Sequence, residues 1–540
     1  MKAIKHTGFV LFLVALTIFT GSLFTGSFQL SKSELDAFLK EKNYKSTVIR
    51  GALEDAVITD KKLTIFKFSA RVRKAYEKSN SYYDALITKY NAAKNWDKKG
   101  EQYQYKIYGK PHTLSYTLAK KAGRGFVKEN ASLIWFLTFG FGMIGALLFM
   151  LPNLILLGKP GIKNNHIYHN SATNRGFVAW LVLIYLVAFY LLLYFKPDYV
   201  VNWTYILDPI SNFLNGGDAS QWFVYGFLYC TIMVTMGVRM YIKYRHNKYQ
   251  IIRTTSVLFF QIVFAFLIPE IMTSLNMPGY DFKNAFPLDY DFFFEWNLKS
   301  LTESGAIGIF ILVWGTLLTL VIVPVMVYFF GKRWYCSWVC GCGGLAETLG
   351  DPYRQHSNKS LNAWKLERWL IHAVLVFSLL MTIVTLYCYF SGTSSFIGIK
   401  SQWIKDTYSF LIGAWFAGVI GTGFYPIFGN RVWCRFGCPL AAYLGLVQRF
   451  KSRFRITTNG GQCISCGNCS TYCEQGIDVR AYAQKGENIV RSSCVGCGIC
   501  SAVCPRGVLK LENGPEAGRI NPTEILLGND VDLMQLVNKK

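Results

Sequence analysis

The chain has 540 residues, and only 16% of them are charged, whereas soluble domains carry about 25% charged residues. Fifty-two per cent of the residues are hydrophobic, and many of them lie in runs of about 20, the length that crosses a bilayer core. These figures exclude a disordered chain, a collagen-like repeat and a small disulfide-rich scaffold. They predict an α-helical polytopic membrane protein.

Eight membrane-spanning helices are expected from these runs. They are, in chain order, 8–27, 131–157, 177–195, 221–242, 254–274, 305–330, 369–390 and 407–428. The last run is rich in glycine, which is commoner in membrane helices than in soluble ones. The first run, within segment 1–27, has features of an anchor and of a cleaved signal. We expect an anchor, because no clear A-x-A cleavage site follows it.

Lysine and arginine are concentrated in alternate connections, as in 239–253 and 431–455, and are sparse in the connections between them. Because cytoplasmic loops carry the excess of positive charge, these connections and both termini are expected on the cytoplasmic side of a bacterial inner (cytoplasmic) membrane. The formal net charge of +25 follows from this topology. The lipid bilayer is therefore an expected partner, and nucleic acid is not.

Segment 28–130 separates the first two spans and is expected outside the cytoplasm. It is polar and reads as largely helical, for example around 71–94, and it has no cysteine. Docking of a partner or a stabilising role is expected for it. The membrane domain, 131–455, follows.

Two cysteine pairs lie where spans six and eight reach the cytoplasmic side. The pairs are Cys336 with Cys340 and Cys434 with Cys438, each in an aromatic-C-x3-C motif. Residues i and i+4 share a helix face, so each pair would present two sulfurs on one side and the four could meet. They could form a redox or metal site, as a bound metal, a cluster or a dithiol–disulfide relay. The alternative is a set of buried structural thiols, the role expected for Cys230 and Cys388.

Segment 456–515 contains the C-x2-C-x2-C-x3-C spacing twice, which is typical of a small α+β bacterial ferredoxin with two [4Fe–4S] clusters. In that arrangement the fourth cysteine of each run ligates the other cluster. The expected ligands are Cys463, Cys466, Cys469 and Cys504 for cluster 1, and Cys494, Cys497, Cys500 and Cys473 for cluster 2. Zinc sites use paired C-x2-C steps and lack the third cysteine. Glu474 stands where proline usually follows the first run, which raises a question of local packing.

Membrane helices with C-x3-C motifs, followed by a cytoplasmic dicluster ferredoxin, resemble the NosR/NapH-type membrane iron–sulfur proteins over about 305–510. The second pair with Pro439 matches the family's C-x3-C-P motif, whereas Gly341-Cys342 replaces the proline after the first pair. The resemblance implies electron transfer from the quinol (menaquinol) pool or a cytoplasmic donor to a respiratory or maturation partner. A more distant resemblance is to CcoG-type oxidase accessory proteins, which implies copper reduction during oxidase assembly.

Other cofactors are not expected. The nearest string to the family's flavin-attachment motif, 171–174, lacks the glycine, so no covalent FMN is predicted. Only His372 lies within a span, so haem is not predicted, and His166 with His169 reads as a solvated loop pair. Glu270 with Gln261 could handle quinol or protons, or Glu270 could be an interfacial carboxylate.

The sequence as a whole predicts an electron-transfer component of a respiratory chain rather than an independent enzyme, and no catalytic residue is assigned. The alternatives are an assembly factor that reduces or hands over copper through the membrane cysteines, and a scaffold with structural clusters. The C-terminal tail, 516–540, carries no assignment.

Overall fold

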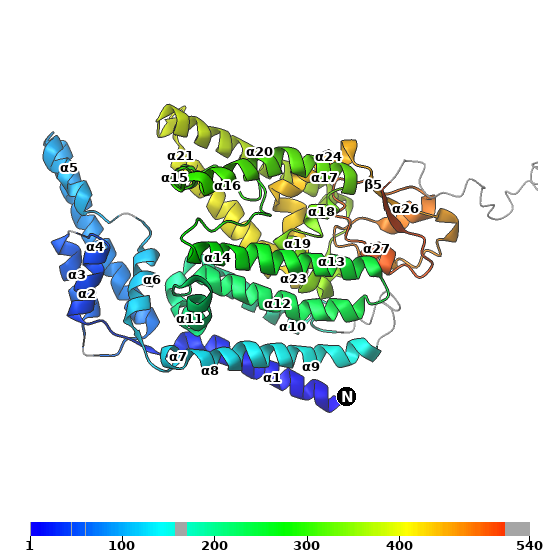
Figure 1. The fold of residues 1–540 in the computed structure, drawn as a ribbon, viewed down its shortest axis with the longest axis horizontal. Helices are drawn as coiled ribbons and strands as arrows, with labels where there is room; N and C mark the ends of the chain where they lie inside the picture. Colours follow the sequence, from blue (N-terminus) through cyan, green and yellow to red (C-terminus); the bar gives the residue numbers. More distant parts are fainter. Residues whose placement is uncertain (1, 45, 60, 108, 157–169, 514–540) are drawn as a thin grey trace, which may run out of the picture. The chain divides into compact units, whose positions relative to one another are not determined.

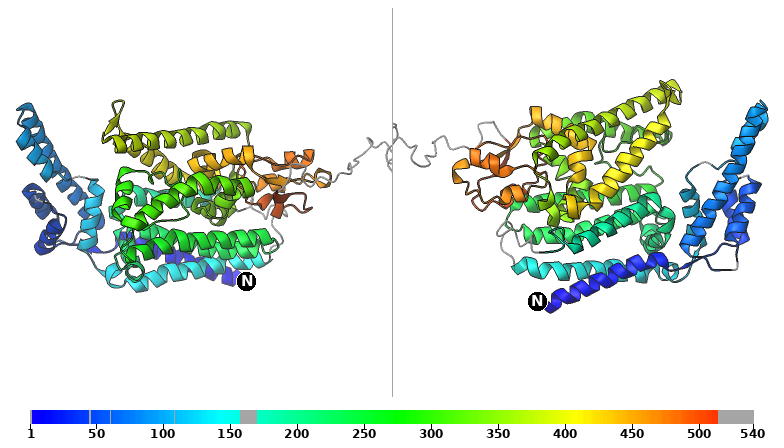
Figure 2. Two further views of the ribbon diagram at one scale, coloured as in Figure 1. Left: turned by 45° about the horizontal axis from the view of Figure 1, so that its top comes forward. Right: turned by 180° about the vertical axis from the view of Figure 1, so that it is seen from behind.

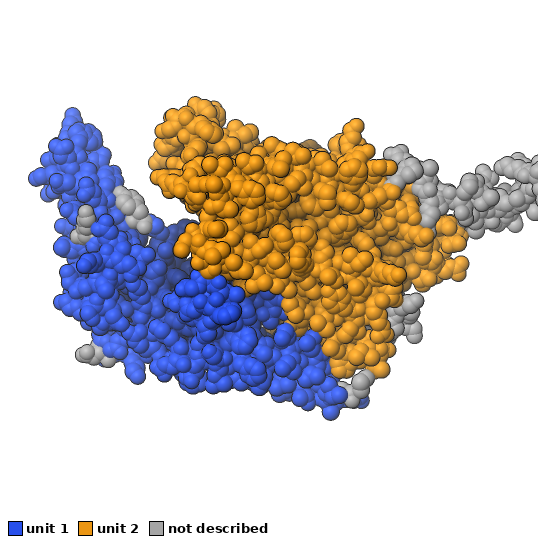
Figure 3. Space-filling view, viewed as in Figure 1, with its two compact units in different colours: residues 1–149, 188–231 blue, residues 150–187, 232–540 orange. Residues whose placement is uncertain are grey.

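The computed structural model describes residues 2–44, 46–59, 61–107, 109–156 and 170–513. The chain divides into two compact units (Figure 3). The first contains 1–149 and 188–231, and the second contains 150–187 and 232–540. His166, His169 and the tail 516–540 lie outside the described residues. The five-segment division expected from the sequence stays a prediction.

The first unit contains the N-terminal helix and its close neighbours. This helix, α1 (Lys2–Gly21), continues into η1 (Ser22–Phe24), and it packs against the run of α8 (Ala131–Trp135), η2 (Phe136–Gly140) and α9 (Phe141–Leu156). A Cβ at Gly8 would lie 2.5 Å from the nitrogen of Phe149, so glycine is needed for this close approach. At the end of α1, Phe19 stacks on Trp203 of α11 (Val201–Asn215) with 4.5 Å between ring centroids.

Segment 28–130 is helical, as expected. Its helices are α2 (Lys32–Glu41), α3 (Thr47–Val57), α4 (Ile65–Ala92), α5 (Trp96–Tyr105), α6 (Pro111–Ala122) and α7 (Phe126–Glu129). Strand β1 (Ser27–Phe28) pairs antiparallel with β2 (Gly123–Arg124), which closes the segment at its two ends. A capping box of Ser31 and Glu34 begins α2. The short helix η4 (Pro197–Tyr199) contacts α4 and α6.

The second unit contains three of the long apolar runs whole, and their α-helices are labelled in Figure 1. Three helices, α9, α10 (Phe177–Phe195) and α12 (Gln221–Lys243), belong partly to each unit. The remaining long runs are α13 (Lys248–Phe259) with η5 (Phe260–Leu267) and α14 (Ile268–Ser274), α16 (Gly305–Leu317) with η6 (Leu318–Ile322) and α17 (Val323–Phe330), and α20 (Leu361–Ser391). Helix α15 (Glu295–Glu303) precedes α16, and a small hairpin of β3 (Ser395–Phe396) and β4 (Ile399–Lys400) follows α20.

Seven helices among the described residues are long and apolar enough to cross a membrane. They correspond to the first seven expected spans. The eighth expected span is helical as α21 (Ser401–Tyr408), η8 (Ser409–Ile420) and α22 (Gly421–Gly423), but it is not one of the seven. Twelve of its residues have π-helical hydrogen bonding, and Gly421 and Gly423 lie at its end. The fold is therefore the expected α-helical one, with about eight spans.

Short elements carry the chain from these helices to the C-terminal module. They are α18 (Arg333–Cys336), α19 (Gly341–Thr348), η7 (Asp351–His356), α23 (Tyr425–Phe428), η9 (Trp433–Gly437) and α24 (Pro439–Lys451). The module itself pairs β5 (Phe454–Thr457) antiparallel with β6 (Lys510–Asn513), and it includes η10 (Gly460–Gln462), α25 (Asn468–Thr471), α26 (Val479–Lys485) and α27 (Ile499–Ala502). Figure 2 shows this module beside α24, at one end of the helices of the second unit.

Candidate functional site

The eight cysteines of the C-terminal module surround two cavities. Cys463, Cys466, Cys469 and Cys504 line one, and Cys473, Cys494, Cys497 and Cys500 line the other. Each cavity takes three sulfurs from one run and the fourth from the other. This is the grouping expected from the spacing, and it fits four thiolates around a cubane cluster.

Two glycines shape the cysteine loops. Gly467 has φ of 76° and Gly498 has φ of 74°, and each residue caps the N-terminus of a short helix, α25 or α27. Glycine adopts this left-handed conformation without the steric cost that a Cβ imposes. The turn reverses the chain directly after the second cysteine of each run, so that the third cysteine faces the same cavity.

The thiols of the module are costly to ionise as bare groups. Burial raises the pKa of Cys469 to about 12 and that of Cys497 to about 12. A metal centre supplies the positive charge that makes such thiolates stable, because a coordinating thiol is deprotonated by the metal. The donor set therefore fits an iron–sulfur cluster in each cavity.

The two membrane cysteine pairs meet around a third cavity. Its lining consists of Leu288, Tyr335, Cys336, Cys340, Cys342, Cys434, Cys438, Leu440 and Ala441. Each of the four paired cysteines is 6% exposed. The structure thus brings both pairs together and adds Cys342, which the sequence marked only as a departure from a motif.

The paired cysteines do not share a helix face, so that expectation was wrong. Cys336 ends α18, whereas Cys340 is the extended residue that begins α19. In the second pair, Cys434 lies in η9, and Cys438 is extended before α24. The physical reason in this second pair is Pro439, which cannot continue a helix and is favoured at the first position of a new one.

Among the described ranges, no three His, Cys, Asp or Glu side chains lie close enough together, as they stand, to form the ligand set of one metal ion. A zinc ion needs each sulfur at about 2.3 Å, which draws the four ligands into a small tetrahedron. At least four cysteines line each of the three cavities, and four thiolates are also the ligand set of a cubane cluster, which is larger than a single ion.

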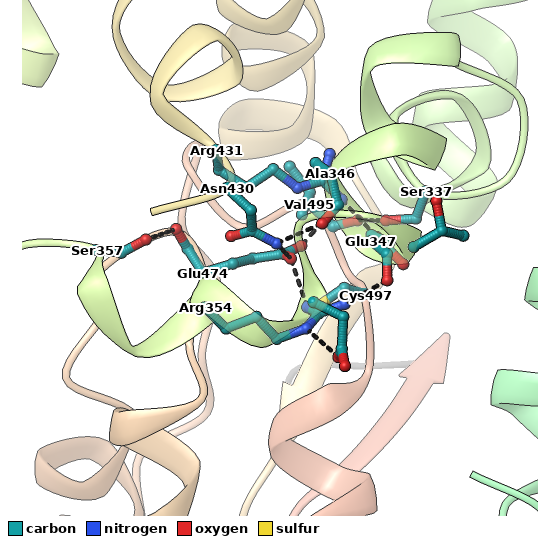
Figure 4. A network of polar contacts seen from close by, with 12 residues as sticks. Ser337, Ala346, Glu347, Arg354, Ser357, Asn430, Arg431, Glu474, Val495 and Cys497 are labelled. Atoms are coloured by element: carbon teal, nitrogen blue, oxygen red, sulfur yellow. Dashed lines mark hydrogen bonds and ion pairs between the residues drawn. The ribbon is translucent and has the colours of Figure 1, made fainter. Parts of the chain in front are cut away.

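A buried ionic network lies between the third cavity and the second (Figure 4). Its centre is Glu474, which is 1% exposed and directly follows Cys473. Arg431 pairs with Glu474 at 2.9 Å, and Arg354 pairs with it as well. Burial alone would raise the pKa of Glu474, but Arg431 and Arg354 outweigh burial and hold this pKa at about 2. Glu474 is therefore an ionised group that ties the module to the helices.

Arg431 also reaches the membrane cysteines. Its Nη1 donates to the carbonyl of Cys336 at 3.3 Å and to Sγ of Cys434 at 3.6 Å. Its Nη2 pairs with Glu347, which in turn pairs with Arg253. The guanidinium of Arg431 thus contacts Cys434, which lines the third cavity, and Glu474, which follows Cys473 of the second cavity. Sequence reasoning missed this link, and the one available signal was Glu474 in place of proline.

The second cysteine loop is held through its backbone. Carbonyls in the loop accept hydrogen bonds from side chains of α13, α24 and the segment after α18. The donors are Gln448 Nε2 to Cys494 at 2.9 Å, Ser337 Oγ to Val495 at 2.8 Å, Tyr249 Oη to Gly496 at 2.8 Å, and Gln250 Nε2 to Cys497 at 2.9 Å. Direct carbonyl contacts of this kind fix the loop to the membrane domain.

The weaker candidates lie in different places. Gln261 donates to the carbonyl of Val339 at 2.5 Å, next to Cys340, and thus contributes to the third cavity's surroundings. Glu270 lies in the first turn of α14. Cys388 is buried within α20, and Cys230 is half-buried within α12.

The chain matches two families of iron–sulfur domain. Residues 444–518 match a 4Fe-4S dicluster domain, and residues 312–360 and 411–457 match a 4Fe-4S binding domain. The latter two segments contain all five cysteines of the third cavity. The matches identify the chain as one with 4Fe–4S domains.

Relatives of the chain are electron-transport and ferredoxin-type proteins. It is 28% identical over 160 residues to "Putative electron transport protein YccM" of Escherichia coli, a match that covers 27% of this chain and 43% of the relative. It is 29% identical over 164 residues to "Methylamine utilization ferredoxin-type protein MauN" of Methylobacillus flagellatus, covering 29% of this chain and 53% of the relative. The chain thus spans about half the length of these relatives, and no solved structure matches it. The similarities support an electron-transfer role.

Proposed function

We propose that the protein is an iron–sulfur electron-transfer component of a bacterial inner membrane, of the NosR/NapH type. It relays electrons between the quinol pool or a cytoplasmic donor and a respiratory or maturation partner. The single observation that carries the proposal is the arrangement of three cysteine-lined cavities, the second and third of which are joined through Arg431 and Glu474.

The first part of the proposal concerns the module. Cys463, Cys466, Cys469 and Cys504 hold cluster 1, and Cys473, Cys494, Cys497 and Cys500 hold cluster 2. When bound, such clusters supply one-electron carriers. The chain's own residues exclude water from the thiolates and set the module's position through the loop contacts described above.

The second part concerns the membrane cysteines. Cys336, Cys340, Cys434 and Cys438 hold a third cluster, with Cys342 as a neighbouring thiol. The convergence of these four cysteines on one cavity, like that in the two module cavities, supports this assignment, as do the two segments that match a 4Fe-4S binding domain. Arg431 supplies positive charge beside Cys434, which favours the thiolate form that a cluster requires.

Iron content tests the assignment. Anaerobically purified full-length protein should contain about twelve irons per chain, against about eight if only the module is loaded. The Cys434→Ser/Cys438→Ser variant should lose about four irons and keep the EPR signals of the module. Cys388→Ser, which removes a buried thiol elsewhere, is the matched control and should lose none. About eight irons in the wild-type protein, unchanged in the variant, would refute the third cluster.

A copper-handling assembly factor remains the second candidate, because five thiols converge on one buried cavity and soft thiolates select Cu(I). The same purified protein distinguishes the two. Copper in place of the additional iron, lost in Cys434→Ser/Cys438→Ser but kept in Cys388→Ser, would favour assembly.

A further inference from the structure

A larger cavity, partly open to solvent, lies beside the second and third cysteine sets. The lining comes from the first turns of α20, from η9 and α24, from the loop after Cys473 and from the loop before Cys494. Cys434 is part of this lining, so the cavity reaches the membrane cysteines as well. Neither the electron-transfer proposal nor the family matches assign it a ligand.

The cavity is strongly basic. Two carboxylates line it, Glu367 and Asp478, and the pair formed by Arg435 and Glu367 at 2.6 Å neutralises one of them. The cations in the lining are Lys332, Lys359, Arg368, Arg435, Arg449 and Arg491. Apart from Arg435, none of these cations has a carboxylate within 4.0 Å in the part of the chain that the structure describes. The excess of positive charge predicts an anionic occupant.

Some of these cations lie where they could compensate the negative charge of cluster-binding thiolates, but others do not. Lys332 and Lys359 already donate to backbone carbonyls, of Ser492 at 3.1 Å and Ser357 at 3.0 Å, close to the second cysteine set whose thiolates they would compensate. Arg368 and Arg491 instead lie over the ring of Trp364, at 5.2 and 5.4 Å from it. A guanidinium held over an aromatic ring keeps its forked donors free for a phosphate.

A buried donor points to the same place. Gln475, which is 3% exposed, lines both this cavity and the cavity of the second cysteine set. Within the described ranges its Nε2 has no hydrogen-bond partner. Leaving a buried amide donor unpaired costs about 1–3 kcal/mol, so a bound acceptor would stabilise it.

The cavity also lies where a membrane helix ends. Leu361, Leu366 and Trp369 of α20 are exposed, with Trp369 at 77%. An exposed tryptophan at a helix end is typical of the membrane–water interface. Basic pockets between helices on the cytoplasmic side bind anionic headgroups.

We propose that this cavity binds a phosphate-bearing anion, held by Arg368 and Arg491 beside Trp364. The phosphate belongs either to the headgroup of an anionic phospholipid or to a soluble compound. Both sources present the same oxygens to the two guanidiniums. Because the cavity adjoins the loop after Cys473, the bound negative charge would disfavour reduction of a cluster in the second cysteine set.

The test uses the full-length holoprotein and a matched pair of variants. Arg368→Gln/Arg491→Gln removes two charges from the cavity, and Lys451→Gln/Arg453→Gln removes two exposed charges outside it. Iron content, measured first, shows whether both fold. If Arg368→Gln/Arg491→Gln loses iron, the single variant Arg368→Gln is used in its place, because Arg368 is exposed and its substitution should not disturb folding.

Native mass spectrometry after detergent washing tests whether the phosphate belongs to a lipid. Titration with inorganic pyrophosphate, monitored through the EPR signal and the midpoint potential of the module, tests whether it belongs to a soluble compound. We expect retained anionic phospholipid, reduced about tenfold or more in the cavity variant and unchanged in the control, since two charge-assisted contacts are lost. If no lipid is retained but pyrophosphate binds, and binds about tenfold more weakly to the cavity variant, the ligand of the cavity is a soluble phosphate. If neither ligand distinguishes the cavity variant from the control, the proposal is wrong, whatever the iron content shows about the clusters.

Discussion

Removing the charge of Glu474 tests whether the ionic network holds the module in place. The Glu474→Gln substitution keeps the shape of the side chain but leaves Arg431 and Arg354 without their shared carboxylate. Breaking a buried pair costs about 3–5 kcal/mol. Arg431 keeps Glu347 and Arg354 keeps Asp351, so we expect the lower end of this range.

The pKa of Glu474 points in the same direction. Burial alone would raise this pKa, but Arg431 and Arg354 hold it at about 2, below the ordinary 4.5, so the fold favours the ionised carboxylate. Because the folded-state pKa is depressed, this stabilisation is complete above about pH 4.5 and is lost as the pH falls towards about 2. The Gln variant should lack this part of the pH dependence.

The assay is thermal loss of the iron–sulfur absorbance in anaerobic holoprotein at pH 7. A destabilisation of about 3 kcal/mol in a cooperative unit of 150–250 residues lowers the midpoint by about 6–12 °C. Glu487→Gln, the same change on the module's exposed surface, is the control and should leave the midpoint unchanged. If Glu474→Gln loses its clusters at the wild-type temperature, apolar packing rather than the network docks the module, and the reasoning fails.

Three further substitutions test the glycines of the cysteine loops and the contacts of Arg431 with Cys434 and Glu474. Gly467→Ala should destabilise the module by about 1–2 kcal/mol through its left-handed backbone alone, since a Cβ there meets nothing within 4 Å. Gly498→Ala should destabilise the module more, because a Cβ there would also lie 2.7 Å from the ring of Tyr249. Equal thermal midpoints for the two variants would contradict this reasoning. Arg431→Lys keeps the charge but loses the forked contact to Cys434 and Glu474, so EPR should show weaker magnetic interaction between the second and third sites with iron content unchanged. An unaltered interaction would show that the guanidinium does not join them.

The sequence predicted the parts of this protein that depend on local chemistry. The cysteine spacing predicted the grouping of sulfurs around two cavities, because a tight loop limits where each side chain can point. The apolar runs predicted seven of the long helices, since the bilayer thickness sets their length. In the eighth run, glycines and π-helical bonding make the pattern weaker.

The missed features depend on residues far apart in the chain. Arg431 and Glu474 are 43 positions apart, and Glu347 joins them from a third segment, so no local pattern marks their pairing. The paired cysteines were expected on one helix face because the chain was assumed to continue as a helix past Cys434. Pro439 was read as a motif match, although it also requires a new helix to begin there.

A buried ionic network is a weak source of stability, because well-packed apolar residues of similar volume often serve as well or better. Its presence between two sets of thiols therefore calls for another reason. An apolar contact could hold the module in place, but it would supply no positive charge beside the thiols of the third cavity. Arg431 does both, since it fixes Glu474 next to Cys473 and lies against Cys434. Glutamate in place of proline after Cys473 thus exchanges a local constraint on the loop for a charged link between two cysteine-lined cavities.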